Sequence, residues 1–250
     1  MNPYLKNLNR IEFVVTDACT GKCIHCQQGS HERFAGHIDA GIAVDAVRKI
    51  CANYTIESLM TFGGESLLFP DIVCQIQRAA AELGIPQRQI ITSGYFSVSH
   101  QKTEETVRNI ADSGVNDLLL SVDAFHQETI PLEPVLYFAE CCVRYKIPIR
   151  LSPAWLVSPQ DQNLYNIRTR KILQEFESLH IPMGSGDIVF PSGNARIYLK
   201  EYFDEDTPES SPYDEDPEDI RSISFSADGT VLNGSVYTAD ILEIIKSYRP

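Results

Sequence analysis

Three cysteines lie within eight consecutive positions of this 250-residue chain, as Cys19, Cys23 and Cys26 in the run CTGKCIHC. This Cys-x3-Cys-x2-Cys spacing lets three sulfurs converge on one centre while the backbone wraps around it. A 4Fe-4S cluster held by three thiolates keeps one iron without a protein ligand, and that iron can bind a substrate. The alternative is a structural zinc site with His25 as the fourth ligand, although His25 is adjacent to Cys26 and would strain a tetrahedral site.

The composition excludes several classes of protein. A hydrophobic content of 43% is enough for a sizeable core, and a formal net charge of −13 argues against binding to nucleic acid or to an anionic membrane. No stretch has the length and apolarity of a membrane span, and the first ten residues lack the apolar centre of a secretion signal. We therefore expect a cytoplasmic protein. Seven cysteines, an odd number, suit reduced thiols better than a disulfide framework.

Strand-like and helix-like runs alternate along most of the chain, which predicts about six β-α units and a mostly parallel sheet with helices outside it. The predicted strands are residues 10–16, 56–62, 89–92, 116–122, 148–156 and 187–190. The predicted helices between them are residues 39–53, 70–84, 103–113, 133–145 and 161–180.

The composition changes after this region. Residues 202–219 carry nine carboxylates and three prolines without a basic residue, which predicts a mobile surface linker. Beyond it, residues 222–225 and 230–232 flank an Asp-Gly turn and predict a hairpin, followed by a helix over 239–248. We therefore divide the chain into a core at 1–200, an acidic linker at 201–221 and a hairpin–helix appendage at 222–250.

A second motif, Gly63-Gly64-Glu65, follows directly after the predicted strand 56–62. Two glycines let the backbone approach a ligand closely. Backbone carbonyls and a carboxylate accept hydrogen bonds, so they suit an ammonium group. Taken alone, the motif is also typical of an ordinary strand-to-helix turn.

Together, the two motifs resemble a known family. The cysteine loop is similar to the signature of the radical S-adenosylmethionine (SAM) superfamily, and GGESLLFPD resembles that family's GGEPLL-type motif. Both motifs follow predicted strands, where ligands bind in parallel α/β sheets. The resemblance covers residues 10–194 and implies an α/β fold with a partial, open, TIM-like (β/α)6 barrel. It also implies one 4Fe-4S cluster on the three cysteines, and SAM bound through its amino group at the GGE motif.

Further residues acquire expected roles from this resemblance. His25 occupies the position of an aromatic residue that packs near the adenine of SAM. Ser121 and Asp123, in LLLSVDAFHQE, resemble a Ser-x-Asp segment that hydrogen-bonds the carboxylate or ribose of SAM. Ser93 belongs to a turn similar to Thr-Asn-Gly. Arg150 either pairs with the carboxylate of SAM or forms a structural ion pair, because a buried arginine requires an anionic partner.

The tail resembles the SPASM or twitch extension of peptide-modifying members of the family, but no cysteine follows Cys142. An auxiliary cluster is therefore not expected. The segment 190–195 (FPSGNA) resembles a Pro-x-Gly-Arg-Ala stretch, with Asn194 at the arginine position. For His126 the alternatives are a residue that faces the substrate and a solvated loop residue, and the second is the more common for a loop histidine. We expect the four remaining cysteines to be small buried hydrophobes: Cys51, Cys74, Cys141 and Cys142.

The expected activity follows from the family. A flavodoxin or ferredoxin would supply an electron that cleaves SAM to a 5'-deoxyadenosyl radical, which abstracts hydrogen from a substrate. The extension-like tail favours a peptide or protein substrate, and a basic leader peptide would be attracted to the acidic linker. A small metabolite is the alternative substrate. A non-catalytic iron–sulfur or zinc protein is the alternative of another class.

Overall fold

The computed structural model describes residues 2–29, 36–204, 211 and 214–250. Its centre is a parallel sheet with the strand order β5-β4-β3-β2-β1-β8. The strands are Arg10–Val14 (β1), Ser58–Phe62 (β2), Gln87–Thr92 (β3), Asp117–Leu120 (β4), Ile149–Leu151 (β5) and Ser222–Phe225 (β8). The predicted α/β class and parallel sheet are confirmed, and the sheet does not close into a barrel.

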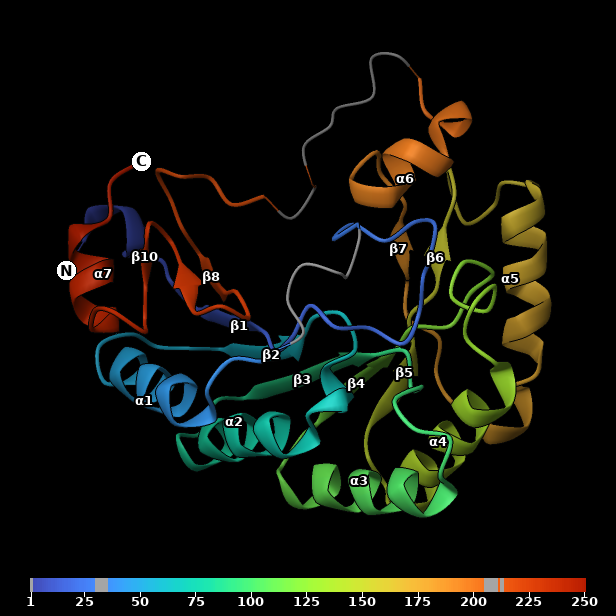
Figure 1. Ribbon diagram of the computed structural model, residues 1–250, viewed down its shortest axis with the longest axis horizontal. Coiled ribbons are helices and arrows are strands. Elements are labelled where there is room, and N and C mark those ends of the chain that lie inside the picture. The colour runs from blue at the N-terminus through green and yellow to red at the C-terminus, as the bar shows by residue number, and fades with distance from the viewer. Residues whose placement is uncertain (1, 30–35, 205–210, 212–213) are drawn as a thin grey trace.

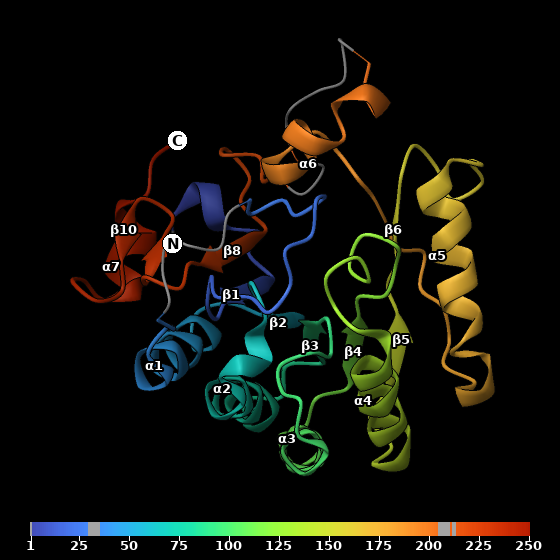
Figure 2. The ribbon, with the colours of Figure 1, turned by 45° about the vertical axis from the view of Figure 1, so that its right-hand side comes forward.

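Helices cover the outer face of this sheet, as Figures 1 and 2 show. The two faces of the sheet differ in burial, as the alternating side chains of β1 show. Ile11 and Phe13 on one face are fully buried, whereas Arg10 and Glu12 on the other face are only partly buried. The four covering helices follow the sheet in chain order: Ala40–Cys51 (α1), Pro70–Glu82 (α2), His100–Asp112 (α3) and Leu132–Arg144 (α4).

Local signals set the ends of these helices. The Asp39 side chain accepts a hydrogen bond from the backbone N–H of Ile42 and caps α1. Pro70 is the first residue of α2, where the missing N–H costs nothing. Gly84 follows the end of α2 with a φ of +75°, in the left-handed region that glycine tolerates.

The far edge of the sheet differs from the prediction of one strand over 148–156. The strand β5 ends before Pro153, because proline has no N–H to donate to a neighbouring strand. The chain then forms a second short strand, Ala154–Trp155 (β6). This short strand pairs in parallel with Asp187–Ile188 (β7) in a separate sheet. The predicted sixth strand therefore exists but does not join the central sheet. Both strands stand upright beyond β5 in Figure 1.

The helix predicted over 161–180 is shorter than expected. It consists of Leu164–Gln174 (α5) and a 3-10 turn at Glu177–Leu179. The segment after β7 contains the short helix Gly193–Tyr198 (α6) and a 3-10 turn at Lys200–Tyr202. Two further 3-10 turns occur at Pro3–Leu5 and Ser66–Leu68.

The prediction that 222–225 and 230–232 form a hairpin was wrong. Residues 222–225 instead form β8, parallel to β1, and the short hairpin joins Thr230–Val231 (β9) to Gly234–Ser235 (β10). Burial explains the difference, because the Phe225 ring is fully buried and stacks on Phe13 at 4.6 Å between centroids.

The last helix, Ile241–Ser247 (α7), lies beside the amino terminus (Figure 1). The Asn2 amide donates hydrogen bonds to the carbonyls of Ile245 and Tyr248. Of the predicted acidic linker, residues 205–210 and 212–213 lie outside the described residues. In the part of the chain that the structure covers, no helix is long and apolar enough to cross a membrane.

Candidate functional site

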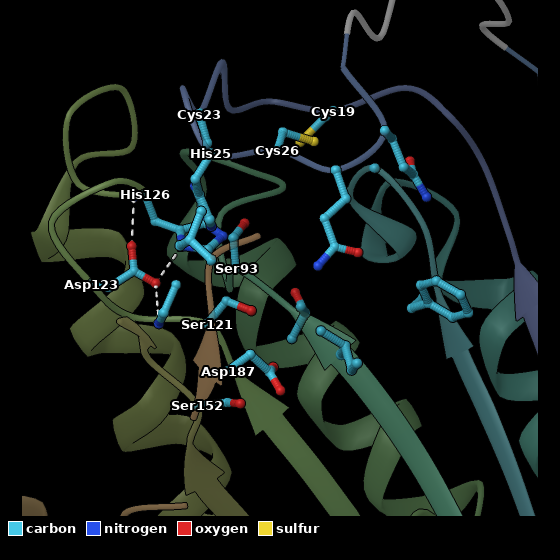
Figure 3. A pocket seen from close by; sticks show the side chains of 18 of the residues that line it. Cys19, Cys23, His25, Cys26, Ser93, Ser121, Asp123, His126, Ser152 and Asp187 are labelled. Carbon is cyan, nitrogen blue, oxygen red and sulfur yellow. Dashed lines mark hydrogen bonds and ion pairs between the residues drawn. The ribbon is translucent and has the colours of Figure 1, made fainter. Parts of the chain in front are cut away.

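A cavity of about 230 Å³ lies at the carboxyl ends of the central strands, under the cysteine loop (Figure 3). Its wall includes Gly63 and Gly64 from the end of β2, and Ile188 from β7. Side chains able to bind a ligand come from several loops: Cys19, Cys23, His25, Cys26, Ser93, Ser121, Asp123, His126, Ser152 and Asp187. The structure thus brings together most of the residues that the sequence singled out.

The three cysteines share one electrostatic environment. Burial raises the pKa of Cys19 to about 11, and the nearby Glu65 and Cys26 add to this. Burial also raises the pKa of Cys23 above its ordinary range, with Asp123, Cys19 and Cys26 contributing. Thiolates so close to one another and to buried carboxylates need a positive centre. A metal cluster supplies one, so the three thiols fit the expected 4Fe-4S cluster.

The loop that carries these cysteines is pressed against the end of β2. The N–H of Gly64 donates to the carbonyl of Thr16, and the N–H of Glu65 donates to the carbonyl of Ala18, both at 2.8 Å. A Cβ atom at Gly64 would stand 2.2 Å from the Ala18 oxygen, which no side chain allows. The glycine pair therefore positions the cysteine loop and forms part of the cavity wall.

The segment after β7 holds the same loop from the other side. The Asn194 side-chain amide donates to the carbonyl of Cys23 at 3.0 Å, and its backbone N–H donates to the carbonyl of Cys26 at 2.9 Å. Gly193 allows this approach, because a Cβ there would lie 2.3 Å from the Gln27 oxygen. Sequence reasoning noted the FPSGNA stretch through its resemblance but missed this contact.

Glu65 is fully buried and does not line the cavity. Its carboxylate accepts hydrogen bonds from the hydroxyl of Thr92, from the N–H and hydroxyl of Ser93, and from the N–H of Leu67. Burial raises the pKa of Glu65, although these hydrogen bonds oppose the rise. In this structure Glu65 joins the ends of β2 and β3, and its contact with SAM stays a prediction.

His25 and His126 face each other in the cavity wall, with ring centroids 4.7 Å apart in an edge-on arrangement. The Nδ1 atom of His25 is buried without a hydrogen-bond partner among the described residues. Burial lowers the pKa of His25 to about 4, and His126 adds to this effect, so the His25 imidazole is neutral at pH 7. His25 therefore offers a flat, uncharged ring beside the cysteines.

Asp123 is fully buried, and its carboxylate accepts hydrogen bonds from three neighbouring residues. One oxygen accepts hydrogen bonds from the N–H groups of Phe125 and His126, and the other from the N–H of Ala154 and from Nδ1 of His126. Ligand atoms of His25, Asp123 and His126 lie within 4.8 Å of one another, a spacing compatible with a metal ion. Both Asp123 oxygens are already occupied, which argues against such a site.

The remaining predicted residues divide between two places. Ser93 and Ser121 line the cavity, whereas Arg150 lies outside its wall. The Arg150 guanidinium forms two hydrogen bonds with Asp117, at 2.9 and 3.1 Å, so the structural ion pair expected as one alternative is present. A contact between Arg150 and SAM stays a prediction. Cys74, Cys141 and Cys142 are buried as predicted, and Cys51 is partly buried.

An open α/β sheet with three thiols at its carboxyl edge is the arrangement expected of a cluster-binding protein of the partial-barrel class. The radical SAM superfamily matches residues 13–140, just over half of the chain, and the protein belongs to this superfamily. It is therefore an enzyme that uses a 4Fe-4S cluster and SAM.

Known proteins resemble the chain at low sequence identity. A GTP 3',8-cyclase of Clostridium perfringens (strain 13 / Type A) is 21% identical over 159 residues, which are 60% of this chain and 47% of the cyclase. The chain thus matches about half the length of this curated relative.

Solved structures also share the fold. Native anSMEcpe with bound AdoMet (SAM) is 13% identical with a TM-score of 0.60, over 93% of this chain and 76% of that one. Streptococcus suis SuiB, bound to precursor peptide SuiA, is 15% identical with a TM-score of 0.54, over 98% and 68%.

Proposed function

We propose that this radical SAM enzyme abstracts a hydrogen atom from a peptide or protein substrate. The observation that carries the proposal is the position of the short strand β7 at the rim of the cavity. Asp187 and Ile188 of β7 are both exposed, and both line the cavity. Within the described part of the chain, β7 pairs with β6 alone.

The hydrogen bonds of β7 indicate how a peptide would bind there. The N–H of Asp187 donates to the carbonyl of Pro153, and the N–H of Val189 donates to the carbonyl of Trp155. Successive N–H groups of a strand point to opposite sides, so the N–H of Ile188 points away from β6. A strand edge that faces away from its neighbouring strand can add an extended peptide as a further strand. The peptide would then lie beside the cofactors.

Each part of the cavity has a role in this proposal. Cys19, Cys23 and Cys26 would hold the cluster, and the Gly63–Gly64 backbone would receive the methionine end of SAM. The neutral His25 ring would pack near the adenine. When bound, the cluster and SAM would supply the radical chemistry that removes a hydrogen atom from the substrate. The protein residues orient the reactants and exclude water.

The proposal includes two partners and a location. A flavodoxin or ferredoxin would supply the electron in the cytoplasm. A basic leader peptide would be attracted to the acidic residues of 202–219, so we expect its affinity to fall as salt is added. Peptide binding that is insensitive to salt would contradict this part.

The second candidate is a small metabolite, which the GTP 3',8-cyclase relative favours. One experiment separates the two candidates. The anaerobically reconstituted, dithionite-reduced protein is given SAM with either peptides encoded beside its gene or a panel of nucleotides that includes GTP. We expect a peptide to increase 5'-deoxyadenosine formation and to change in mass. Stimulation by a nucleotide alone would overturn the peptide proposal, and no 5'-deoxyadenosine under any condition would indicate a non-catalytic protein.

A further inference from the structure

The two sides of the cavity come from opposite ends of the central sheet. The cysteine loop, where the cluster and SAM are expected, follows β1, whereas Ser152 follows β5 and Asp187 begins β7. Figure 3 shows Asp187 and Ser152 on the side of the cavity away from the labelled cysteines. This second side is therefore the part of the cavity that a substrate would contact.

Backbone hydrogen bonds bring Asp187 and Ser152 to the same part of the wall. The N–H of Ser152 donates to the carbonyl of Leu120 at 2.8 Å, which holds Ser152 at the end of β4. The N–H of Asp187 donates at 3.0 Å to the carbonyl of Pro153, the residue directly after Ser152. A carboxylate and a hydroxyl from different elements thus line the cavity together.

The Ser152 hydroxyl keeps its capacity to bind a ligand. Among the residues that the structure describes, its oxygen has no hydrogen-bond partner. A serine oxygen accepts hydrogen bonds as well as donating one, so it can complement a neighbouring carboxylate in binding N–H groups.

The charge on this side of the cavity is negative. No lysine or arginine is among the described residues that line the cavity. The charge of Arg150 acts on Asp187, but the Arg150 guanidinium donates hydrogen bonds to Asp117 at 2.9 and 3.1 Å. One arginine therefore serves two carboxylates, and a negative charge is left over. Such a wall attracts a cation and repels an anion such as the phosphate groups of a nucleotide.

We propose that Asp187, together with the Ser152 hydroxyl, binds a positively charged side chain of the substrate. The inference rests on the peptide substrate proposed above. A peptide strand added beside β7 would place one residue opposite Asp187, and opposite residues of paired strands project from the same face. That side chain would enter the cavity that Asp187 lines. Lysine and arginine carry only hydrogen-bond donors, which suit two oxygen acceptors.

The test compares peptides that differ in one side chain. The probes are acetylated pentapeptide amides with lysine, norleucine or glutamate between two alanines on each side. Their affinities for the cluster- and SAM-loaded protein are measured by anaerobic isothermal titration calorimetry without reductant, so that SAM is not cleaved. We expect the lysine peptide to bind about tenfold more tightly than the norleucine peptide, equivalent to about 1.4 kcal/mol. The glutamate peptide should bind most weakly.

Variants of Asp187 assign this preference to its charge. In Asp187→Asn the lysine and norleucine peptides should bind equally, within about twofold, because only the charge is removed. Asp187→Lys should reverse the order and favour the glutamate peptide. Ser152→Ala should reduce the preference for lysine about threefold. Iron and sulfide content per chain verifies that each variant holds its cluster.

A matched control and the contrary outcomes complete the test. Asp112→Asn removes the same charge at an exposed position of α3 and should keep the full preference for lysine. Equal affinities of the three peptides for the unmodified protein, or an unchanged preference in Asp187→Asn, would overturn the cation subsite and leave the peptide proposal intact. No binding of any of the three peptides would contradict the peptide proposal and the subsite with it.

Discussion

At the scale of single residues, polar groups at this site either face the ligand or support those that do. Glu65 and Asp123 have carboxyl groups of the kind that often contact ligands, yet both are fully buried and saturated by hydrogen bonds from the protein. Ser93 does both, since it lines the cavity and donates to Glu65. Residue type alone does not separate these roles, because a carboxylate accepts from a backbone N–H as readily as from a ligand.

Glu65 provides a test at this scale. Glu65→Gln would place amide hydrogens against the donors of Thr92 and Ser93, so we expect a loss of about 2 kcal/mol in the free energy of unfolding. Urea denaturation of the cluster-free protein measures this loss. The exposed Glu57 offers a matched control, since Glu57→Gln should change stability by less than about 0.5 kcal/mol. Equal effects of the two substitutions would refute the anchoring role.

At the scale of elements, strand ends bring distant loops into contact. The end of β2 and the segment at Asn194 both contact the cysteine loop, although they lie far apart in the sequence. On the inner face of the sheet, Arg150 of β5 and Asp117 of β4 form an ion pair across neighbouring strands. Such contacts depend on strand order and register, which the sequence pattern does not specify.

Gly64→Ala tests the close approach of β2 to the cysteine loop. The added Cβ would meet backbone atoms of Ala18 at 2.2 Å and 2.7 Å, so the loop must shift. We expect the reconstituted variant to bind clearly less iron and sulfide per chain than the unmodified protein. Gly41→Ala is the control, because this exposed position lies in α1, where alanine is favoured. Full cluster content in Gly64→Ala would contradict the geometry.

The Asp117–Arg150 pair predicts a pH dependence. Burial acts to raise the pKa of Asp117, but hydrogen bonds from Arg150 and Gln89 outweigh it and hold the pKa below its usual range. A lowered pKa contributes stability above about pH 4 that is lost as pH falls further. Unfolding measured from pH 7 to pH 3 should therefore show a smaller acid loss in Asp117→Asn than in the unmodified protein. The exposed Asp112→Asn should keep the full loss.

At the scale of the whole molecule, the two ends of the chain are joined. Strand β8 extends the central sheet next to β1, and Asn2 caps the carboxyl end of α7. The Phe13 and Phe225 rings stack in the common core. The tail therefore shares its buried surface with the start of the chain.

This arrangement predicts that the tail and the core unfold together. Phe225→Ala removes a fully buried ring and should lower the free energy of unfolding by about 3 to 5 kcal/mol. The denaturation should stay a single transition, with the same midpoint by far-UV circular dichroism and by tryptophan fluorescence. Ser224→Ala, on the exposed face of the same strand, should have little effect. Two separate transitions would show an independent tail.

The sequence by itself determined the chemistry of the site and most of the strands and helices. Thiol spacing is local, and the glycine pair follows directly after a strand, so Cys19, Cys23, Cys26 and Gly63–Gly64 could be proposed together from their joint resemblance to one family, without the tertiary structure. The tertiary structure decided the partners that meet across the fold: β8 beside β1, Arg150 with Asp117, and Asp123 with His126. These depend on which surfaces are buried together, a global balance of packing and desolvation that no short segment encodes.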